Sequence, residues 1–201
     1  MISIKVSIDD GASKAITALL SSLTGRQAAE INEQAGLAAR DAAVKYHRGF
    51  DAAKRWRGTR YLGPGPGGSS FGSEVAEGWH LASHTAGGAV IENGARYYRH
   101  KVDGGTIKPK HGKFLTIPLV QEAKGRTVAS YRRDTGKKLF RPKGKNVLME
   151  STGKGTVRSV YALVTSVTQG PWKGALPPED KIASAYTDKY REELIEIITK
   201  S

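Results

Sequence analysis

The residues of this chain whose types could support chemistry include five histidines, and their spacing fits no catalytic or metal site. His80 and His84 lie four residues apart in a predicted strand and turn, without the glutamate that accompanies two such histidines in helical metalloprotease motifs. His100 and His111 flank a Gly-Gly turn and would approach each other in a hairpin, but Asp103 is the only nearby carboxylate. Because a protein zinc site needs three or four ligands, we interpret the histidines as polar surface and predict no metal.

Signatures of catalytic nucleophiles and of phosphate-binding loops are also missing. The sequence has no cysteine, which excludes thiolate nucleophiles and cysteine-based metal sites, and it has no Gly-x-Ser-x-Gly motif. The glycine-rich stretch 63–68 follows no predicted strand and precedes no Lys-Ser or Lys-Thr, so it does not fit a phosphate-binding loop. Residues 96–145 contain only three carboxylates, too few to suggest the clustered magnesium ligands of a nuclease. We therefore predict that the protein is not an enzyme and uses no cofactor.

Positive charge is the strongest chemical feature of the sequence, and it is confined to one segment. The net charge is +13, and residues 96–145 hold fifteen Lys/Arg against three Asp/Glu. The flanking residues 1–95 hold ten against nine, and residues 146–201 hold seven against seven. We call residues 96–145 the basic block. Charge gathered in this way favours an acidic partner, either nucleic acid or an acidic protein surface; a solvated basic surface that aids solubility is the alternative.

The contacts with such a partner are predicted to come from thirteen cationic side chains of the basic block. These are Arg96, Arg99, Lys101, Lys108, Lys110, Lys113, Arg132, Arg133, Lys137, Lys138, Arg141, Lys143 and Lys145.

Length and composition predict a single domain of 201 residues with a modest core and long excursions, because only 38% of the residues are hydrophobic and 24 are glycine. No apolar run approaches the roughly 20 residues that span a bilayer, so we expect no contact with a membrane. The N-terminal residues lack a basic region followed by an apolar core, which predicts no secretory signal. The absence of cysteine fits synthesis in a reducing cytoplasm.

The N-terminal elements are predicted from hydrophobic periodicity. Residues 2–8 alternate between apolar and polar side chains, as in a half-buried strand, and helices are expected over 12–23 and from about 27 to 50. The second helix has an apolar stripe made mostly of alanine, and such a stripe buries little area and depends on a close partner. The stripe consists of Ile31, Ala35, Ala38, Ala42 and Tyr46.

Residues 51–73 lose all periodicity and form a predicted long Gly/Pro-rich loop. Loops of this length are usually functional or disordered. Trp56, Arg57 and Tyr61 could stack on nucleic-acid bases or anchor the loop to a neighbouring subunit, and we favour the subunit contact.

The segment 97–119 is predicted to turn at Gly104–Gly105, present a basic loop or hairpin, and end in a buried strand over 114–117. Residues 119–133 read as a short helix or a loop, and residues 179–201 as a C-terminal helix. The fold class is therefore α+β: a mainly antiparallel sheet packed by two N-terminal helices and one C-terminal helix, with long loops. The remaining strands are expected at 79–83, 88–92, 137–140, 147–150 and 158–166, the last being central because both of its faces are apolar.

Several phrases, in order, give the chain a resemblance to the tail-completion and head–tail joining proteins of tailed bacteriophages, the virion-morphogenesis group. The likeness covers about residues 70–180. Its phrases are Ile91–Tyr98, Gly104–Lys110, Lys113–Pro118, Leu139–Leu148, Val160–Gln169 and Leu176–Pro178.

The resemblance implies an α+β structural subunit that forms a homo-oligomeric ring, with a hexamer as one option, at the neck of the virion. There it would finish the tail and join it to the head, in contact with neighbouring neck, connector or tail-terminator proteins. Such a protein is made in the host cytoplasm and carries no catalytic residues. The basic block would then face packaged DNA in the channel or an acidic surface of the adjoining ring. The alternative is a free nucleic-acid-binding protein that uses the basic block.

Overall fold

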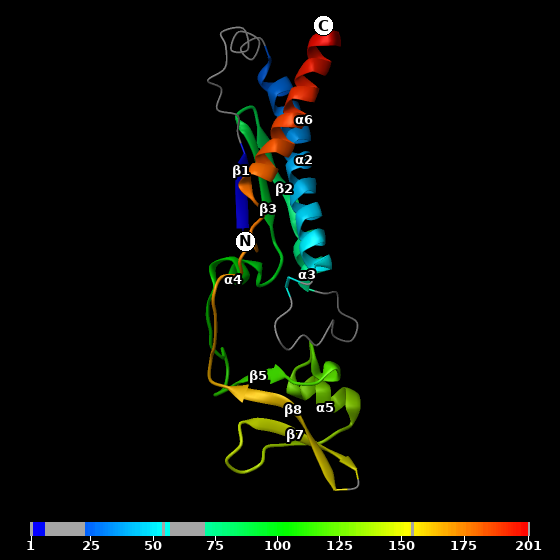
Figure 1. Cartoon of the computed structure of the whole chain (residues 1–201), viewed down its shortest axis with the longest axis vertical. Helices are drawn as coiled ribbons and strands as arrows, with labels where there is room; N and C mark the ends of the chain where they lie inside the picture. The colour runs from blue at the N-terminus through cyan, green and yellow to red at the C-terminus, as the bar shows by residue number, and fades with distance from the viewer. Residues whose placement is uncertain (1, 7–22, 54, 57–70, 154, 201) are drawn as a thin grey trace. The chain divides into compact units, whose positions relative to one another are not determined.

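The computed structural model describes residues 2–6, 23–53, 55–56, 71–153 and 155–200 (Figure 1). Its internal contacts divide the chain into two compact units. Unit 1 comprises residues 1–55, 72–102 and 172–201, and unit 2 comprises residues 56–71 and 103–171. Nearly all of the helix predicted over 12–23 lies outside the described residues, as do Arg57 and Tyr61.

Unit 1 is built on a three-stranded antiparallel sheet with the order β1-β3-β2. Ile4 of the first strand pairs with Ile91 of the central strand, which pairs with Leu81 on its other side. The predicted hairpin between the second and third strands is confirmed. Its turn is tighter than expected, because pairing continues to Thr85 and Gly88. The strands are β1 (Ile2–Val6), β2 (Trp79–Thr85) and β3 (Gly88–Asn93).

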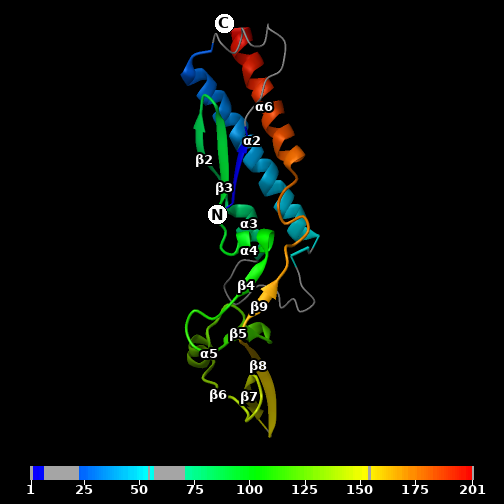
Figure 2. The same cartoon turned by 90° about the vertical axis from the view of Figure 1, so that its left-hand side faces the viewer.

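The long helix α2 (Gly25–Ala52) packs on this sheet, and α6 (Glu179–Lys200) runs along α2 (Figure 2). The side chain of Thr24 caps the start of α2 and forms a capping box with Gln27. The helix approaches the sheet closely at Gly36, where an added Cβ would lie 2.7 Å from the Cβ of Ala89.

The buried side of α2 differs from the predicted alanine stripe. Ile31 and Ala35 are buried as expected, but Ala38, Ala42 and Tyr46 are only half-buried. The reason is that α2 contacts both the sheet and α6, so its buried surface is wider and partly polar. The buried residues of α2 are Ile31, Asn32, Ala35, Gly36, Ala39, Ala43, His47 and Phe50.

Unit 2 contains a two-stranded and a four-stranded antiparallel sheet, with the orders β4-β9 and β5-β8-β7-β6. The strand that was expected to be central, β8, lies between β5 and β7 as predicted. A 3-10 turn, η1 (Gln121–Ala123), and the helix α5 (Val128–Thr135) pack on the larger sheet. The strands are β4 (Gly105–Ile107), β5 (Leu115–Pro118), β6 (Leu139–Phe140), β7 (Val147–Gly153), β8 (Thr156–Val164) and β9 (Val167–Gln169).

The α+β class is confirmed, with a long N-terminal helix and a C-terminal helix packed together, but the segment 97–119 is not a hairpin. A short helix, α4 (Tyr98–Asp103), precedes the glycine turn, and β4 pairs with β9 instead of β5. Gly104 adopts a φ of 72°, and an added Cβ would lie 2.7 Å from the Gln169 carbonyl oxygen, so this turn requires glycine. Another short helix, α3 (Phe71–Glu77), begins inside the predicted loop 51–73.

Candidate anion-binding surface

The two structural units differ sharply in charge. Unit 2 contains sixteen Lys/Arg and four Asp/Glu, whereas unit 1 contains sixteen Lys/Arg and fifteen Asp/Glu. The boundary of the positive charge therefore coincides closely with a boundary of the fold. Of the thirteen predicted contact residues, Arg96, Arg99 and Lys101 belong to unit 1, and the other ten belong to unit 2.

Two of the three predicted contact residues in unit 1 stack on aromatic rings of their own unit. The ammonium of Lys101 lies 4.4 Å from the centre of the Trp172 ring, and burial lowers the pKa of Lys101. The guanidinium of Arg96 lies 4.8 Å from the ring centre of Tyr97. Arg99 is exposed on α4.

Lys137 of unit 2 is one of two cations that neutralise a buried carboxylate, Glu150. The Lys137 ammonium lies 2.9 Å from Oε1 of Glu150, and the guanidinium of Arg158 lies 2.5 Å from the same oxygen. The hydroxyl of Tyr131 donates to Oε2 at 2.9 Å. Burial alone would raise the pKa of Glu150, but these three hydrogen bonds outweigh it and lower that pKa. The cluster ties α5 to β7 and β8, and no local pattern in the sequence indicates it.

Arg141 organises the turn between β6 and β7. Its guanidinium lies 4.9 Å from the ring centre of Phe114, and it donates to the Lys145 carbonyl and to Oδ1 of Asn146, each at 2.8 Å. The ammonium of Lys113 lies 5.8 Å from the centre of the Phe114 ring. These contacts hold two predicted contact residues in the structure of unit 2. Arg133 is similarly engaged, 3.1 Å from Asp134.

The remaining predicted contact residues of unit 2 have exposed side chains that form no ion pair with the described residues. Most are lysines, whose compact ammonium groups attract phosphate or carboxylate without the paired geometry that arginine offers. Such a set favours sequence-independent binding of a polyanion. We call these six residues the free cations of unit 2: Lys108, Lys110, Arg132, Lys138, Lys143 and Lys145.

Trp56, a predicted base-stacking or subunit contact, takes part in the packing of its own unit. Its side chain is 8% exposed, and its ring meets that of Phe71 edge to face at 5.1 Å.

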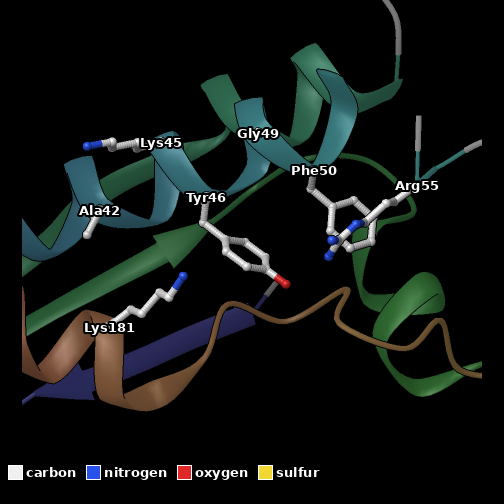
Figure 3. Close-up of a pocket in the computed structure, with 7 residues that line it drawn as sticks. All are labelled: Ala42, Lys45, Tyr46, Gly49, Phe50, Arg55 and Lys181. Carbon is white, nitrogen blue, oxygen red and sulfur yellow. The ribbon is translucent and has the colours of Figure 1, made fainter. Parts of the chain in front are cut away.

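An open cavity of about 490 Å³ in unit 1 is lined by three cations and two aromatic rings (Figure 3). The hydroxyl of Tyr46 donates to the Gly174 carbonyl at 2.7 Å, and the Arg55 guanidinium lies 5.6 Å from the Phe50 ring centre. The lining cations do not converge on one point, because the ammonium of Lys45 extends away from the other labelled side chains. The cavity therefore lacks the arrangement of a specific anion site.

Among the described residues, no group of three or more His, Asp or Glu side chains is placed to hold a metal ion. No described helix combines the length and the apolar character needed to cross a bilayer. Comparison of the chain with protein-family models, curated proteins and solved structures gave no match.

Proposed function

We propose that this chain is a structural assembly subunit that binds an anionic partner through the free cations of unit 2. The observation that carries the proposal is the segregation of charge, sixteen Lys/Arg against four Asp/Glu in unit 2, in contrast to a nearly neutral unit 1. A separate compact unit with this charge attracts polyanions over distances of about a Debye length, roughly 8 Å at physiological salt.

The setting we propose is the head–tail junction of a tailed bacteriophage, where a ring of this subunit would complete the tail and join it to the head. The support is the resemblance described above, whose phrases fall in both units: Ile91–Tyr98 and Leu176–Pro178 in unit 1, and the others in unit 2. Its neighbours would be neck, connector or tail-terminator proteins.

The anionic partner in that setting is packaged DNA in the channel or an acidic surface of an adjoining protein. Binding to DNA would release counterions, so the affinity would fall steeply as salt rises. Salt-insensitive binding to duplex DNA, or no binding at low salt, would exclude DNA and leave the acidic protein.

The second candidate function is a free nucleic-acid-binding protein, which the same free cations favour. The buried ring of Trp56 gives no support to base stacking at that position. Native mass spectrometry of the purified 21.6 kDa chain, combined with a gel-shift assay on duplex DNA, separates the two candidates. A defined oligomer, or one that forms only with neck or tail proteins, supports the assembly subunit. A monomer that shifts DNA supports the free binder.

A further inference from the structure

The sheet β5-β8-β7-β6 of unit 2 has one face that η1 and α5 cover. The hydroxyl of Tyr161 donates to the Arg126 carbonyl at 3.1 Å, just before α5. The hydroxyl of Tyr131, within α5, donates to Glu150 of β7. Tyr161 and Glu150 therefore both point to the covered face.

The pairing register identifies the side chains that point the other way. Residues paired across antiparallel strands share a face, and successive residues alternate. Glu150 pairs with Leu139, and Tyr161 pairs with both Leu148 and Pro118, so these residues belong to the covered face. Their neighbours along each strand form the opposite face, which we call the open face: Leu115, Ile117, Phe140, Val147, Met149 and Val164.

The open face is apolar although nothing among the described residues buries it. Phe140 is 45% exposed and Ile117 is 38% exposed, and the other four members are half-buried. The solvated face of an antiparallel sheet normally carries polar side chains, so a contiguous apolar face marks an interaction surface. Five of its six side chains are not aromatic and offer no plane on which a base could stack, which favours a protein as its occupant.

Unit 1 carries a surface with the complementary properties at the end of α6. Ile195 and Ile198 are 60% and 44% exposed, and their spacing of three places them on one side of the helix. Beside them, a hollow of about 400 Å³ is lined by residues of α2 and α6 that include four glutamates and, among the described residues, no lysine or arginine. We call this surface the acidic helix end: Ile195, Ile198 and the glutamates Glu30, Glu33, Glu193 and Glu196.

We propose that the open face of one copy of the chain binds the acidic helix end of a second copy. Both surfaces are apolar at their centre, and their charges are opposite, because the cations Lys138 and Arg141 flank β6 in strongly basic unit 2. Two open faces meeting each other would instead bring two basic units together, which like-charge repulsion opposes. A contact between two different surfaces leaves one of each kind unused, so it continues from copy to copy and closes as a ring when the rotation allows.

This contact deepens the proposed function and rests on it for the ring, and it is tested directly by cross-linking, since the chain has no native cysteine. Ile117→Cys and Ile198→Cys variants are mixed, oxidised with diamide and separated on a non-reducing gel. The matched controls are Ile107→Cys in the two-stranded sheet, 38% exposed like Ile117, and Leu176→Cys before α6, 44% exposed like Ile198. Thermal unfolding of every variant checks that these surface changes leave the fold intact.

The expected result is a disulfide-linked dimer in the Ile117→Cys and Ile198→Cys mixture that exceeds both control mixtures several-fold. Each variant alone should give little dimer. An equal yield in the control mixtures, or a strong dimer from Ile117→Cys alone, would overturn the proposal; the latter would indicate an interface between two open faces. Loss of this cross-link while the chain still binds polyanions would refute the subunit contact and leave the anion-binding function standing.

Discussion

The ammonium of Lys137 lies 2.9 Å from Oε1 of Glu150, a carboxylate whose side chain has no exposed surface. Its sequence neighbour Lys138 is exposed and forms no ion pair with the described residues. Two adjacent lysines of the basic block thus have different roles, one within the structure of unit 2 and one on its surface.

The first prediction compares these neighbours by stability. Lys137→Met removes one of the two cations at Glu150 while Arg158 remains, so unfolding should become easier by about 1 kcal/mol. Lys138→Met should change the free energy of unfolding by less than about 0.5 kcal/mol, as is usual for exposed positions. Urea denaturation of both variants measures the difference. Equal effects would mean that the ion pair with Glu150 contributes nothing.

The second prediction concerns acid stability. Hydrogen bonds from Lys137, Arg158 and Tyr131 lower the pKa of Glu150 below its usual 4.5 in spite of burial. The unfolded carboxyl therefore binds protons more readily than the folded one. The stabilisation is present above the usual pKa and is lost as the pH falls through the folded pKa.

Glu150→Gln should accordingly cost roughly 2 kcal/mol at pH 7, less than for a fully buried pair because its two cations reach solvent. The difference between the wild type and Glu150→Gln should shrink as the pH falls below about 4.5. Free energies of unfolding measured at both pH values provide the check. Parallel pH curves for the two proteins would show that Glu150 is not the titrating group.

The third prediction concerns the protonation of His47 in unit 1. The indole of Trp79, which can only donate, donates to Nδ1 of His47 at 2.9 Å, so that nitrogen carries no proton. The proton must then be on Nε2, which lies 2.9 Å from the Ala175 carbonyl oxygen that also accepts from Tyr98. Nitrogen-15 NMR of the imidazole should show the Nε2–H tautomer at pH 7. An Nδ1–H tautomer would contradict the hydrogen bond from Trp79.

The fourth prediction follows from the burial of the same histidine. Burial lowers the pKa of His47 below 6.5, so the unfolded state takes up a proton first as the pH falls. Stability contributed by neutral His47 is therefore present above pH 6.5 and declines below it. A His47→Gln variant should lose this pH dependence between about pH 7 and 5, whereas His84→Gln, at an exposed position, should keep it.

Strong hydrophobic periodicity made the larger elements predictable. The alternation in residues 2–8, the hairpin around residue 86 and the apolar stripe after Pro178 each require only local residues, and the structure contains all three over the residues it describes. The short helix α4 was missed because it has little periodicity of its own. Its buried Tyr98 is held by hydrogen bonds to His47 and Ala175, which are distant in sequence.

The amount of positive charge could be predicted from the sequence, but its availability could not. Counting residues gives the same weight to Lys137 and Lys138, although only the pairing of β6 with β7 reveals that Glu150 lies beside Lys137. The open face was missed for a similar reason. Ile117, Val147 and Phe140 are in separate strands, and only their register places them on one face.

Salt-dependent binding of duplex DNA, used as a polyanion probe, tests the central claim that the free cations of unit 2 form a binding surface. The full chain is compared with a Lys108→Ala, Lys110→Ala, Lys143→Ala, Lys145→Ala variant and with a Lys5→Ala, Lys173→Ala control in unit 1. The unit 2 variant should bind more weakly, and the slope of log affinity against log salt should fall by about 0.9 for each phosphate that the variant no longer neutralises. The unit 1 control should keep the slope of the wild type. The same slope and affinity in the unit 2 variant as in the wild type would contradict the claim.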